Sequence, residues 1–245
     1  MLAKSEQAVP RLEFFESIDS TNLALERADR SALPELTAFV AASQTAGQGR
    51  LGRAWVSEPG SSISLSLLLR PTAQEEKGWL TLMMATAVRA TVTYFAPESE
   101  PKIKWPNDVL VSEKKISGIL AKVVGNDVIL GVGINLKSQQ GAPENATALD
   151  ALGSKASFDD VLFELLTQFR ARYGKFQSDA GWAITQTAEE FRQHSSTLGT
   201  QVMALLPSGD QIRGTATDID PQGNLVIQAD SKHVISAADI IHLRN

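Results

Sequence analysis

The first 195 residues of this 245-residue chain alternate between short apolar runs and segments with helical spacing of apolar residues. The short runs, rich in Val, Ile, Leu and Phe, predict strands over 12–15, 36–42, 63–70, 101–105, 109–112, 115–124 and 127–135. Helical spacing predicts helices over 22–30, 77–95 and 182–193. Ser157 followed by Asp160 has the pattern of a capping box and predicts a further helix that contains 161–169.

The last fifty residues change character. Short apolar runs over 201–206, 212–219, 225–227, 233–235 and 240–243 follow one another closely, and turn-forming residues at 207–210 and 220–224 separate them. This pattern predicts a small all-β barrel. We therefore expect two domains, 1–195 and 196–245, with the boundary near 195–199.

Composition narrows the class of protein. A net charge of -5 argues against a nucleic-acid-binding module, which usually carries a basic surface. The absence of cysteine excludes a disulfide framework and a cysteine nucleophile, and it suits a reducing cytosol. The N-terminus lacks the apolar core of a signal peptide, and the longest apolar run, 65–69, is too short to cross a bilayer. We expect a cytoplasmic protein that binds neither nucleic acid nor membrane.

A local excess of positive charge stands out against this acidic background. Five lysines (102, 104, 114, 115 and 122) lie in or beside short predicted strands, with only Asp108 and Glu113 among them. Strands joined by a Pro-Asn-Asp turn would bring several ammonium groups together. Such a cluster suits an anionic small ligand that carries a carboxylate, a phosphate or both.

A glycine-rich segment follows the second predicted strand. Its sequence, Gly47-Gln-Gly-Arg-Leu-Gly52, has the spacing of a dinucleotide fingerprint, but no helix start follows it, as that site would require. The catalytic-loop and metal-binding motifs of kinases are also missing. A mobile surface loop is the simplest alternative. Arg50, Arg53 and Trp55 favour a loop that folds over an anionic, partly apolar ligand.

Three other segments combine structural and chemical interpretations. Ser20 or Thr21 can cap the first helix, and the same hydroxyls can bind a polar head group. The stretch from Lys104 to Asp108 suits a hairpin turn that leads toward Lys115, and Gly118 permits close backbone approach. The glycines that precede Asn135 either relieve crowding or make room for a flat ring.

None of the histidines, at 194, 233 and 242, falls in these segments, and no Ser/His/Asp or metal-spaced cluster is present. The chain offers cations, amides, hydroxyls and glycines instead of a nucleophile or base. This inventory fits a reaction that depends on charge stabilisation and positioning.

Taken in order, the segments resemble the signatures of the biotin–protein ligase family. The resemblance lies in Asp19-Ser-Thr-Asn22, Gln44-Thr-Ala-Gly-Gln-Gly-Arg-Leu-Gly-Arg-Ala-Trp55, Lys104-Trp-Pro-Asn-Asp108, Lys115-Ile-Ser-Gly-Ile-Leu120 and Gly131-Val-Gly-Ile-Asn135. It implies an α+β fold in which a mixed β-sheet, like that of class II synthetases, is flanked by helices and followed by an SH3-like β-barrel.

The resemblance also implies a two-step reaction. Biotin and MgATP give biotinyl-5′-AMP, and a lysine of a biotin carboxyl carrier domain, such as that of acetyl-CoA carboxylase, then takes the biotinyl group. The implied catalytic residues are Lys115, Arg50 and Lys104. The implied biotin site is Ser20, Thr21, Asn22, Gln44, Gly47, Gln48, Trp55, Lys115, Gly118 and Leu120. The implied ATP site is Arg50, Arg53, Lys104, Asn107 and Asn135, and Asp108 is a candidate magnesium ligand.

Two differences from the family pattern have consequences. The family loop usually reads G-R-G-R-x-G-R, and Gln48 replaces its first arginine, so this side chain can donate a hydrogen bond but carries no charge. The chain begins close to the first predicted strand, which suggests the monofunctional type without an N-terminal helix-turn-helix domain. Lipoate–protein ligase and a non-catalytic biotin-binding regulator are the alternatives, and both monomer and homodimer remain open.

Overall fold

A seven-stranded mixed sheet forms the centre of the protein. The computed structural model describes residues 2–55 and 58–243. The strand order is β1-β2-β3-β7-β6-β5-β4, and β1 pairs with β2 in parallel while the other pairs are antiparallel. The strands are β1 (Arg11–Phe15), β2 (Thr37–Ala41), β3 (Ser62–Leu69), β4 (Lys102–Lys104), β5 (Asp108–Val111), β6 (Lys114–Val124) and β7 (Asp127–Asn135).

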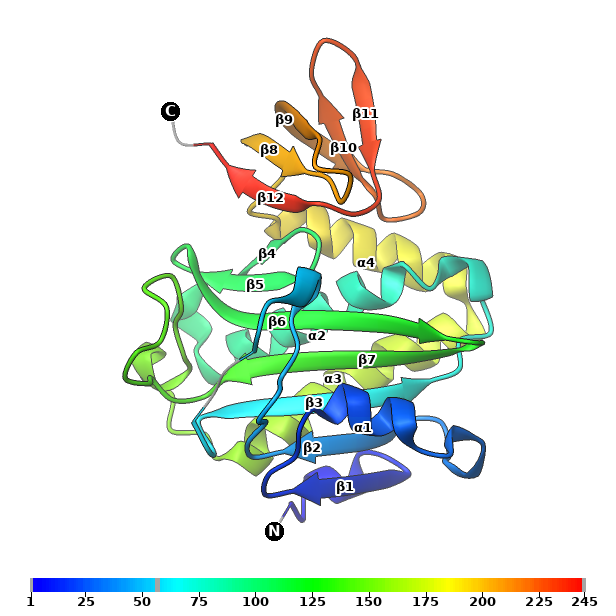
Figure 1. Cartoon of the computed structure of the whole chain (residues 1–245), viewed down its shortest axis with the longest axis vertical. Coiled ribbons are helices and arrows are strands. Elements are labelled where there is room, and N and C mark those ends of the chain that lie inside the picture. The colour runs from blue at the N-terminus through cyan, green and yellow to red at the C-terminus, as the bar shows by residue number, and fades with distance from the viewer. Residues whose placement is uncertain (1, 56–57, 244–245) are drawn as a thin grey trace.

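Helices cover the two faces of this sheet unequally. The short α1 (Thr21–Arg27) lies on one face, where it contacts β2, β3 and β7. On the other face lie α2 (Trp79–Phe95), α3 (Phe158–Ser178) and α4 (Ala180–His194), which pack against one another (Figure 1). Because α1 is short, it leaves much of its face of the sheet uncovered, and the glycine-rich loop crosses the central strands there.

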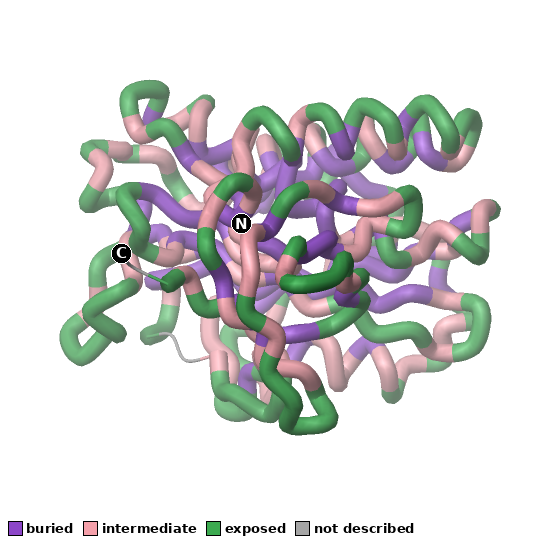
Figure 2. The backbone as a smooth tube through the Cα atoms, turned by 90° about the horizontal axis from the view of Figure 1, so that it is seen from above, coloured by how far each residue is buried: buried purple, intermediate pink, exposed green. Residues whose placement is uncertain are grey.

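Burial follows these layers. Figure 2 shows the buried chain segments gathered in the interior of the molecule and the exposed ones around its outside. The main core lies between the sheet and α2–α4, and its largest fully buried side chains include Trp79, Phe169 and Tyr173. A smaller core lies under α1, where Leu25 packs with Phe39.

The last part of the chain forms a separate five-stranded antiparallel sheet in the order β11-β10-β9-β8-β12. Its strands are β8 (Gln201–Leu205), β9 (Gln211–Ile219), β10 (Leu225–Gln228), β11 (Lys232–Ile235) and β12 (Asp239–His242). Two indole N–H groups hold its β9–β10 turn against the first domain: Trp79, at the start of α2, donates to the carbonyl of Pro221, and Trp105, just after β4, donates to that of Gly223, each at 3.0 Å.

The predicted fold class is confirmed, since a mixed sheet with flanking helices precedes a small antiparallel β-domain. Helix boundaries differ by a few residues. The first helix ends at Arg27 instead of 30. The last begins at Ala180 instead of 182, because Asp179 caps it by accepting a hydrogen bond from the amide of Trp182 at 3.0 Å. No helix in the described ranges is long and apolar enough to cross a membrane.

Candidate active site

One end of the site is built where α1 begins. Ser20 is the N-cap of this helix, as the sequence predicts, and its hydroxyl accepts a hydrogen bond from the amide of Leu23 at 3.5 Å. Thr21 donates to Gln44 Oε1 from its amide, at 2.8 Å, and from its hydroxyl, at 3.2 Å. Because the carbonyl oxygen of Gln44 is held by Thr21, its NH₂ group is left to donate elsewhere.

The glycine-rich segment forms a tight hairpin. The amide of Trp55 donates to the carbonyl of Gly47 at 2.9 Å, and the amide of Gly49 donates to that of Arg53 at 2.7 Å. At its tip, Leu51 has the left-handed angles φ 55° and ψ 37°. Glycine is required at 47, since a Cβ there would lie 2.3 Å from the carbonyl oxygen of Trp55. Residues 56 and 57 of the predicted loop lie outside the described residues.

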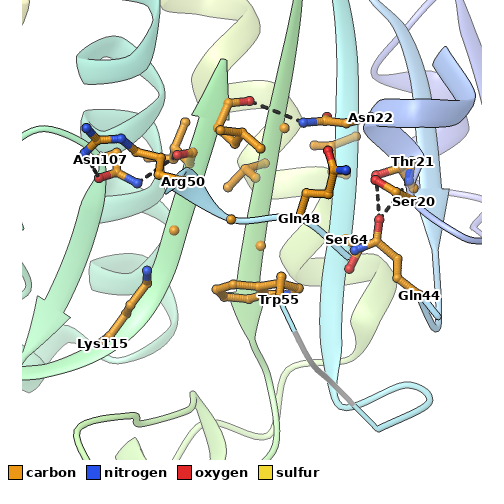
Figure 3. Close-up of a pocket in the computed structure, with 18 residues that line it drawn as sticks. Ser20, Thr21, Asn22, Gln44, Gln48, Arg50, Trp55, Ser64, Asn107 and Lys115 are labelled. Carbon is orange, nitrogen blue, oxygen red and sulfur yellow. Dashed lines mark hydrogen bonds between the residues drawn. The ribbon is translucent and has the colours of Figure 1, made fainter. Parts of the chain in front are cut away.

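The indole of Trp55 lies on a floor of glycines. A Cβ added to Gly133 would lie 2.3 Å from the indole ring, and one added to Gly118 would lie 3.3 Å from it. The two glycines face each other across β7 and β6. The missing side chains therefore make a shallow trough in the sheet, which accommodates a flat ring, and in this structure the ring is that of Trp55 (Figure 3).

Cations lie at the other end of the trough. Lys115 Nζ is 2.7 Å from Asp108 Oδ1 and 5.7 Å from the centre of the Trp55 ring. Arg50 donates to Asn107 Oδ1 at 3.0 Å and to the carbonyl of Ala238, in the C-terminal domain, at 3.2 Å. Burial lowers the pKa of Arg50 from its ordinary value, with Asp239 and Asp108 acting in the opposite direction, and the guanidinium stays protonated at neutral pH.

Two adjoining cavities result. The first, with a volume of about 60 Å³, runs from the start of α1 to Lys115, and most of the predicted biotin-site residues line it: Ser20, Thr21, Asn22, Gln44, Gln48, Trp55, Lys115, Gly118 and Leu120. Arg50 and Asn107 line it as well. This volume is below the range of roughly 300–1,000 Å³ that is usual for small-molecule sites. The indole of Trp55 must therefore shift before a ligand of that size can enter.

The second cavity, of about 380 Å³, continues from Lys115 toward the C-terminal domain. Arg53, Lys104 and Asp108 line it, and so does Asp239 from the C-terminal domain, which forms an ion pair with Arg53. Arg50, Trp55, Asn107 and Lys115 border both cavities. A ligand with an apolar ring at one end and phosphates at the other would extend through the two.

The structure also locates the other residues that the sequence singled out. Of the five lysines, only Lys104 and Lys115 line these cavities among the described residues. Lys122 pairs instead with Glu26 at 2.7 Å, because it lies farther along β6 near α1. Asn135 lines neither cavity, and its amide donates to the carbonyl of Thr147 at 2.9 Å. Gly47 shapes the hairpin behind Gln44 without lining either cavity.

Sequence reasoning missed Ser64, which also lines the first cavity. The residue is 3% exposed, and its hydroxyl has no hydrogen-bond partner among the described residues. The available signal was the alternation of serine with Ile and Leu over 62–66, which places polar groups on one face of an otherwise apolar strand.

Among the described residues, Asp108 and Asp239 are the only carboxylates that line the two cavities. Residues 2–55 and 58–243 contain no group of three or more His, Asp or Glu side chains placed to hold an ion. Asp108 is already paired with Lys115, and Asp239 with Arg53. Among the described residues, the protein therefore offers no ready-made cluster of carboxylates for magnesium.

Comparison with known proteins identifies the constellation. The profile described as "Biotin/lipoate A/B protein ligase family" matches residues 14–138, which include α1, the hairpin, the glycine floor and Lys115. The chain belongs to this family. A second profile, "Biotin protein ligase C terminal domain", matches residues 197–243.

Individual members of the ligase family are similar over nearly the whole chain. The "Biotin--[acetyl-CoA-carboxylase] ligase" of Mycobacterium tuberculosis is 36% identical, covering 96% of this chain and 90% of the relative. The "Bifunctional ligase/repressor BirA" of Bacillus subtilis is 32% identical over 96% of this chain and 75% of the relative. The biotin protein ligase from Aquifex aeolicus, solved with biotin and ATP, superposes with a TM-score of 0.83 at 27% identity, over 96% of this chain and 100% of that one.

Proposed function

We propose that this protein is an ATP-dependent biotin–protein ligase that activates biotin as biotinyl-5′-AMP and transfers it to a lysine of a carboxyl carrier domain. The observation that carries the proposal is the joining of a polar cavity and a cationic cavity at Lys115. The relative from Mycobacterium tuberculosis supports biotin transfer, and the Aquifex aeolicus neighbour supports biotin and ATP as ligands.

The polar end of the first cavity suits the cyclic urea of biotin. Ser20 Oγ already accepts a hydrogen bond from the amide of Leu23, and Gln44 Oε1 already accepts one from Thr21. The hydroxyl of Ser20 and the NH₂ group of Gln44 are therefore free to donate to a ligand. Asn22 is held by Ser66, which donates to its Oδ1 at 2.5 Å. Because these polar side chains are fixed by the protein itself, they are preorganised to bind a urea carbonyl.

The other end suits the reaction between a carboxylate and the α-phosphate of ATP. Two anions repel each other as the carboxylate oxygen attacks the α-phosphorus and pyrophosphate leaves, and Lys115, at the junction, is placed to contact both anions. Arg50, Arg53 and Lys104 supply further positive charge around the second cavity. Preorganised donors of this kind contribute about 10²–10³-fold each to a rate.

Trp55 and the hairpin would protect the product. When the indole of Trp55 lifts from the Gly118–Gly133 floor, biotin can take its place. The indole can then close over the valeryl chain of biotin. A mixed anhydride that is shielded in this way escapes hydrolysis until a lysine amine attacks its acyl carbon. The amine forms an amide with the biotinyl group, and AMP leaves.

Magnesium, the carrier domain and location belong to the same proposal. We infer that Mg²⁺ arrives with ATP and is held chiefly by its phosphates, as is usual for this ion. The acceptor is a biotin carboxyl carrier domain, by analogy with the named substrate of the Mycobacterium tuberculosis relative. The use of ATP and the absence of cysteine support a cytosolic location, and a net charge of -5 supports a surface that does not bind nucleic acid.

A direct assay tests the function. Purified protein is incubated with MgATP, a carrier domain and either biotin or lipoate, and AMP formation and the mass of the carrier are measured. We expect biotin-dependent AMP and a single biotinyl addition to the carrier. Turnover with lipoate alone would establish the lipoyl alternative. Tight biotin binding without AMP formation would establish a non-catalytic regulator.

A further inference from the structure

Three serines alternate along β3 on the side of the sheet that faces the site. Ser62, Ser64 and Ser66 are 0%, 3% and 0% exposed. The hydroxyl of Ser66 donates its proton to Asn22 Oδ1 at 2.5 Å and lies 2.8 Å from Thr21 Oγ1. The hydroxyls of Ser62 and Ser64 have no hydrogen-bond partner among the described residues. Buried hydroxyls are normally paired, so each of these two requires an explanation.

Only one of the two unpaired hydroxyls reaches the site. Ser64 lines the first cavity, and Ser62 lines neither cavity among those described. Figure 3 places Ser64 beside Gln44, at the end of the cavity formed by Ser20 and Thr21. Ser64 is therefore an unpaired hydroxyl at the end of the first cavity near α1. Ser62, two residues earlier on the same strand, carries the same group outside the site.

The neighbours of Ser64 determine what it can bind. Gln44 Oε1 and Ser20 Oγ already accept hydrogen bonds from Thr21 and Leu23, so these side chains chiefly offer donors. A cyclic urea has one carbonyl acceptor and two N–H donors. The donors of Gln44 and Ser20 match the carbonyl, and a partner for an N–H must come from another group with a free acceptor. The lone pairs of Ser64 Oγ are such acceptors.

We propose that Ser64 is a specificity-determining residue whose hydroxyl accepts a hydrogen bond from a ureido N–H of biotin. The inference rests on the proposed function, since it takes biotin as the ligand. A site with a buried polar group discriminates against analogues that leave the group unpaired. Ser64 therefore favours a ring that carries N–H over an apolar ring such as that of lipoate.

Binding calorimetry on two matched variants tests this role. Ser64→Ala and Ser62→Ala remove the same hydroxyl from the same strand and face, and only the first touches the cavity. We expect Ser64→Ala to raise the Kd for biotin about 5- to 10-fold, the usual worth of one neutral hydrogen bond. Ser62→Ala should leave the Kd within about twofold. Ser64→Cys, which retains bulk but accepts hydrogen bonds weakly, should resemble Ser64→Ala.

Two further measurements separate recognition from structure. Desthiobiotin keeps the ureido ring and lacks the sulfur, so Ser64→Ala should weaken it by the same factor as biotin. Melting of the free protein should be preserved or shifted upward in both alanine variants, because each removes a buried unpaired hydroxyl. A loss of affinity without a loss of stability is not expected of a residue that only supports the strand.

The outcomes that overturn the inference are distinct. Unchanged biotin affinity in Ser64→Ala would remove the contact, and equal losses in Ser64→Ala and Ser62→Ala would make the effect structural. Weaker binding of biotin but not of desthiobiotin would assign the contact to sulfur and overturn the ureido assignment. A parent protein that binds no biotin would overturn the proposed function and this inference together, whereas normal parent binding with unchanged Ser64→Ala overturns only the inference.

Discussion

Lys115 and Asp108 form an ion pair, with Nζ 2.7 Å from Oδ1, at the point where the two cavities meet. The side chains are 34% and 23% exposed, so the pair is partly shielded from solvent. Asp108 holds the ammonium group of Lys115 between the first cavity, which begins at α1, and the cationic second cavity. Ligand phosphates would compete with this carboxylate for the same charge, and Lys115 would then pass from one anion to another.

The first prediction concerns Lys115. Lys115→Ala removes the charge at the junction, and we expect biotin-dependent pyrophosphate release to fall by about 10²–10³-fold. Lys122→Ala is the control, because Lys122 lies on the same strand but pairs with Glu26 away from the cavities. A Lys115→Ala enzyme with near-normal pyrophosphate release would refute the assignment.

The second prediction concerns Gln48, which lines the first cavity where the family pattern has arginine. Gln48→Arg adds a charge that can meet the biotin carboxylate, and we expect it to lower the Kd for biotin about 5-fold, the usual gain of a charged over a neutral hydrogen bond. Calorimetry measures the change. If Gln48→Arg and Gln48→Ala both bind biotin like the parent, only the backbone of the hairpin contacts biotin at this position.

The third prediction concerns the contact of Trp55 with Gly133. Gly133→Ala places a Cβ 2.3 Å from the indole in the present conformation. We expect a loss of about 1–3 kcal/mol in the free energy of unfolding, the usual cost of overpacking, measured by urea denaturation. In a Trp55→Ala background, where the indole is absent, Gly133→Ala should cause much less of this loss.

Gly174 provides the matched control for this substitution. It lies in α3 with open space around its Cα, so Gly174→Ala should be neutral or stabilising, by up to about 1 kcal/mol. A double variant as unstable as the sum of its single changes would show that Trp55 does not rest on the floor in solution.

The fourth prediction concerns the ion pair between Arg53 and Asp239, which joins the hairpin to the C-terminal domain. Asp239 also brings negative charge to the second cavity, where we propose that phosphates bind. Asp239→Asn should therefore lower the KM for ATP, by about two- to fivefold. Thermal stability should change little, because exposed ion pairs contribute roughly 0–1 kcal/mol. A higher KM for ATP would mean that the pair positions Arg53 rather than competing with the nucleotide.

The fifth prediction concerns acid pH. Burial, together with Lys104, lowers the pKa of His242 from its ordinary value, and burial with Arg89 and Lys102 lowers that of His194. The folded protein therefore binds these protons less readily than the unfolded chain. The stability associated with neutral histidines is present above the ordinary pKa of about 6.5 and is lost as pH falls through the lower folded pKa.

Urea midpoints at pH 7.5 and 5.5 measure this effect. The midpoint should fall at pH 5.5, and it should fall less in His242→Gln. The affected carboxyl groups have lowered pKa values, about 2 for Asp19 and Asp160, so their titration lies below this window. Equal falls in the parent and in a His194→Gln/His242→Gln variant would exclude the histidines as the cause.

The local elements were predictable because their signals are local. Ser157 and Asp160 form the reciprocal capping box that opens α3, with Ser157 Oγ 2.6 Å from Asp160 Oδ2. The apolar runs formed strands because short runs of apolar residues are typical of strands that are buried in a sheet. Gly118 and Gly133 were recognisable as positions of close approach, because a residue without a side chain leaves room for a neighbour.

Distance in space was not predictable in the same way. The sequence placed five lysines in one short stretch, yet only Lys104 and Lys115 line the cavities. Lys114 alternates with Lys115 on β6, and Lys102 and Lys122 lie farther along their strands. Ser64 has no motif of its own, and its importance depends on β3 lying beside β7.

The sequence alone therefore determined the order of helices and strands, the two-part architecture and the family, since capping, periodicity and motif spacing are properties of neighbouring residues. Only the tertiary structure decided that Trp55 rests on Gly133, that Arg50 and Arg53 contact the C-terminal domain, and that Ser64 faces the cavity unpaired. These relationships join residues that are far apart in the chain. They depend on sheet register and domain packing, which no local pattern encodes.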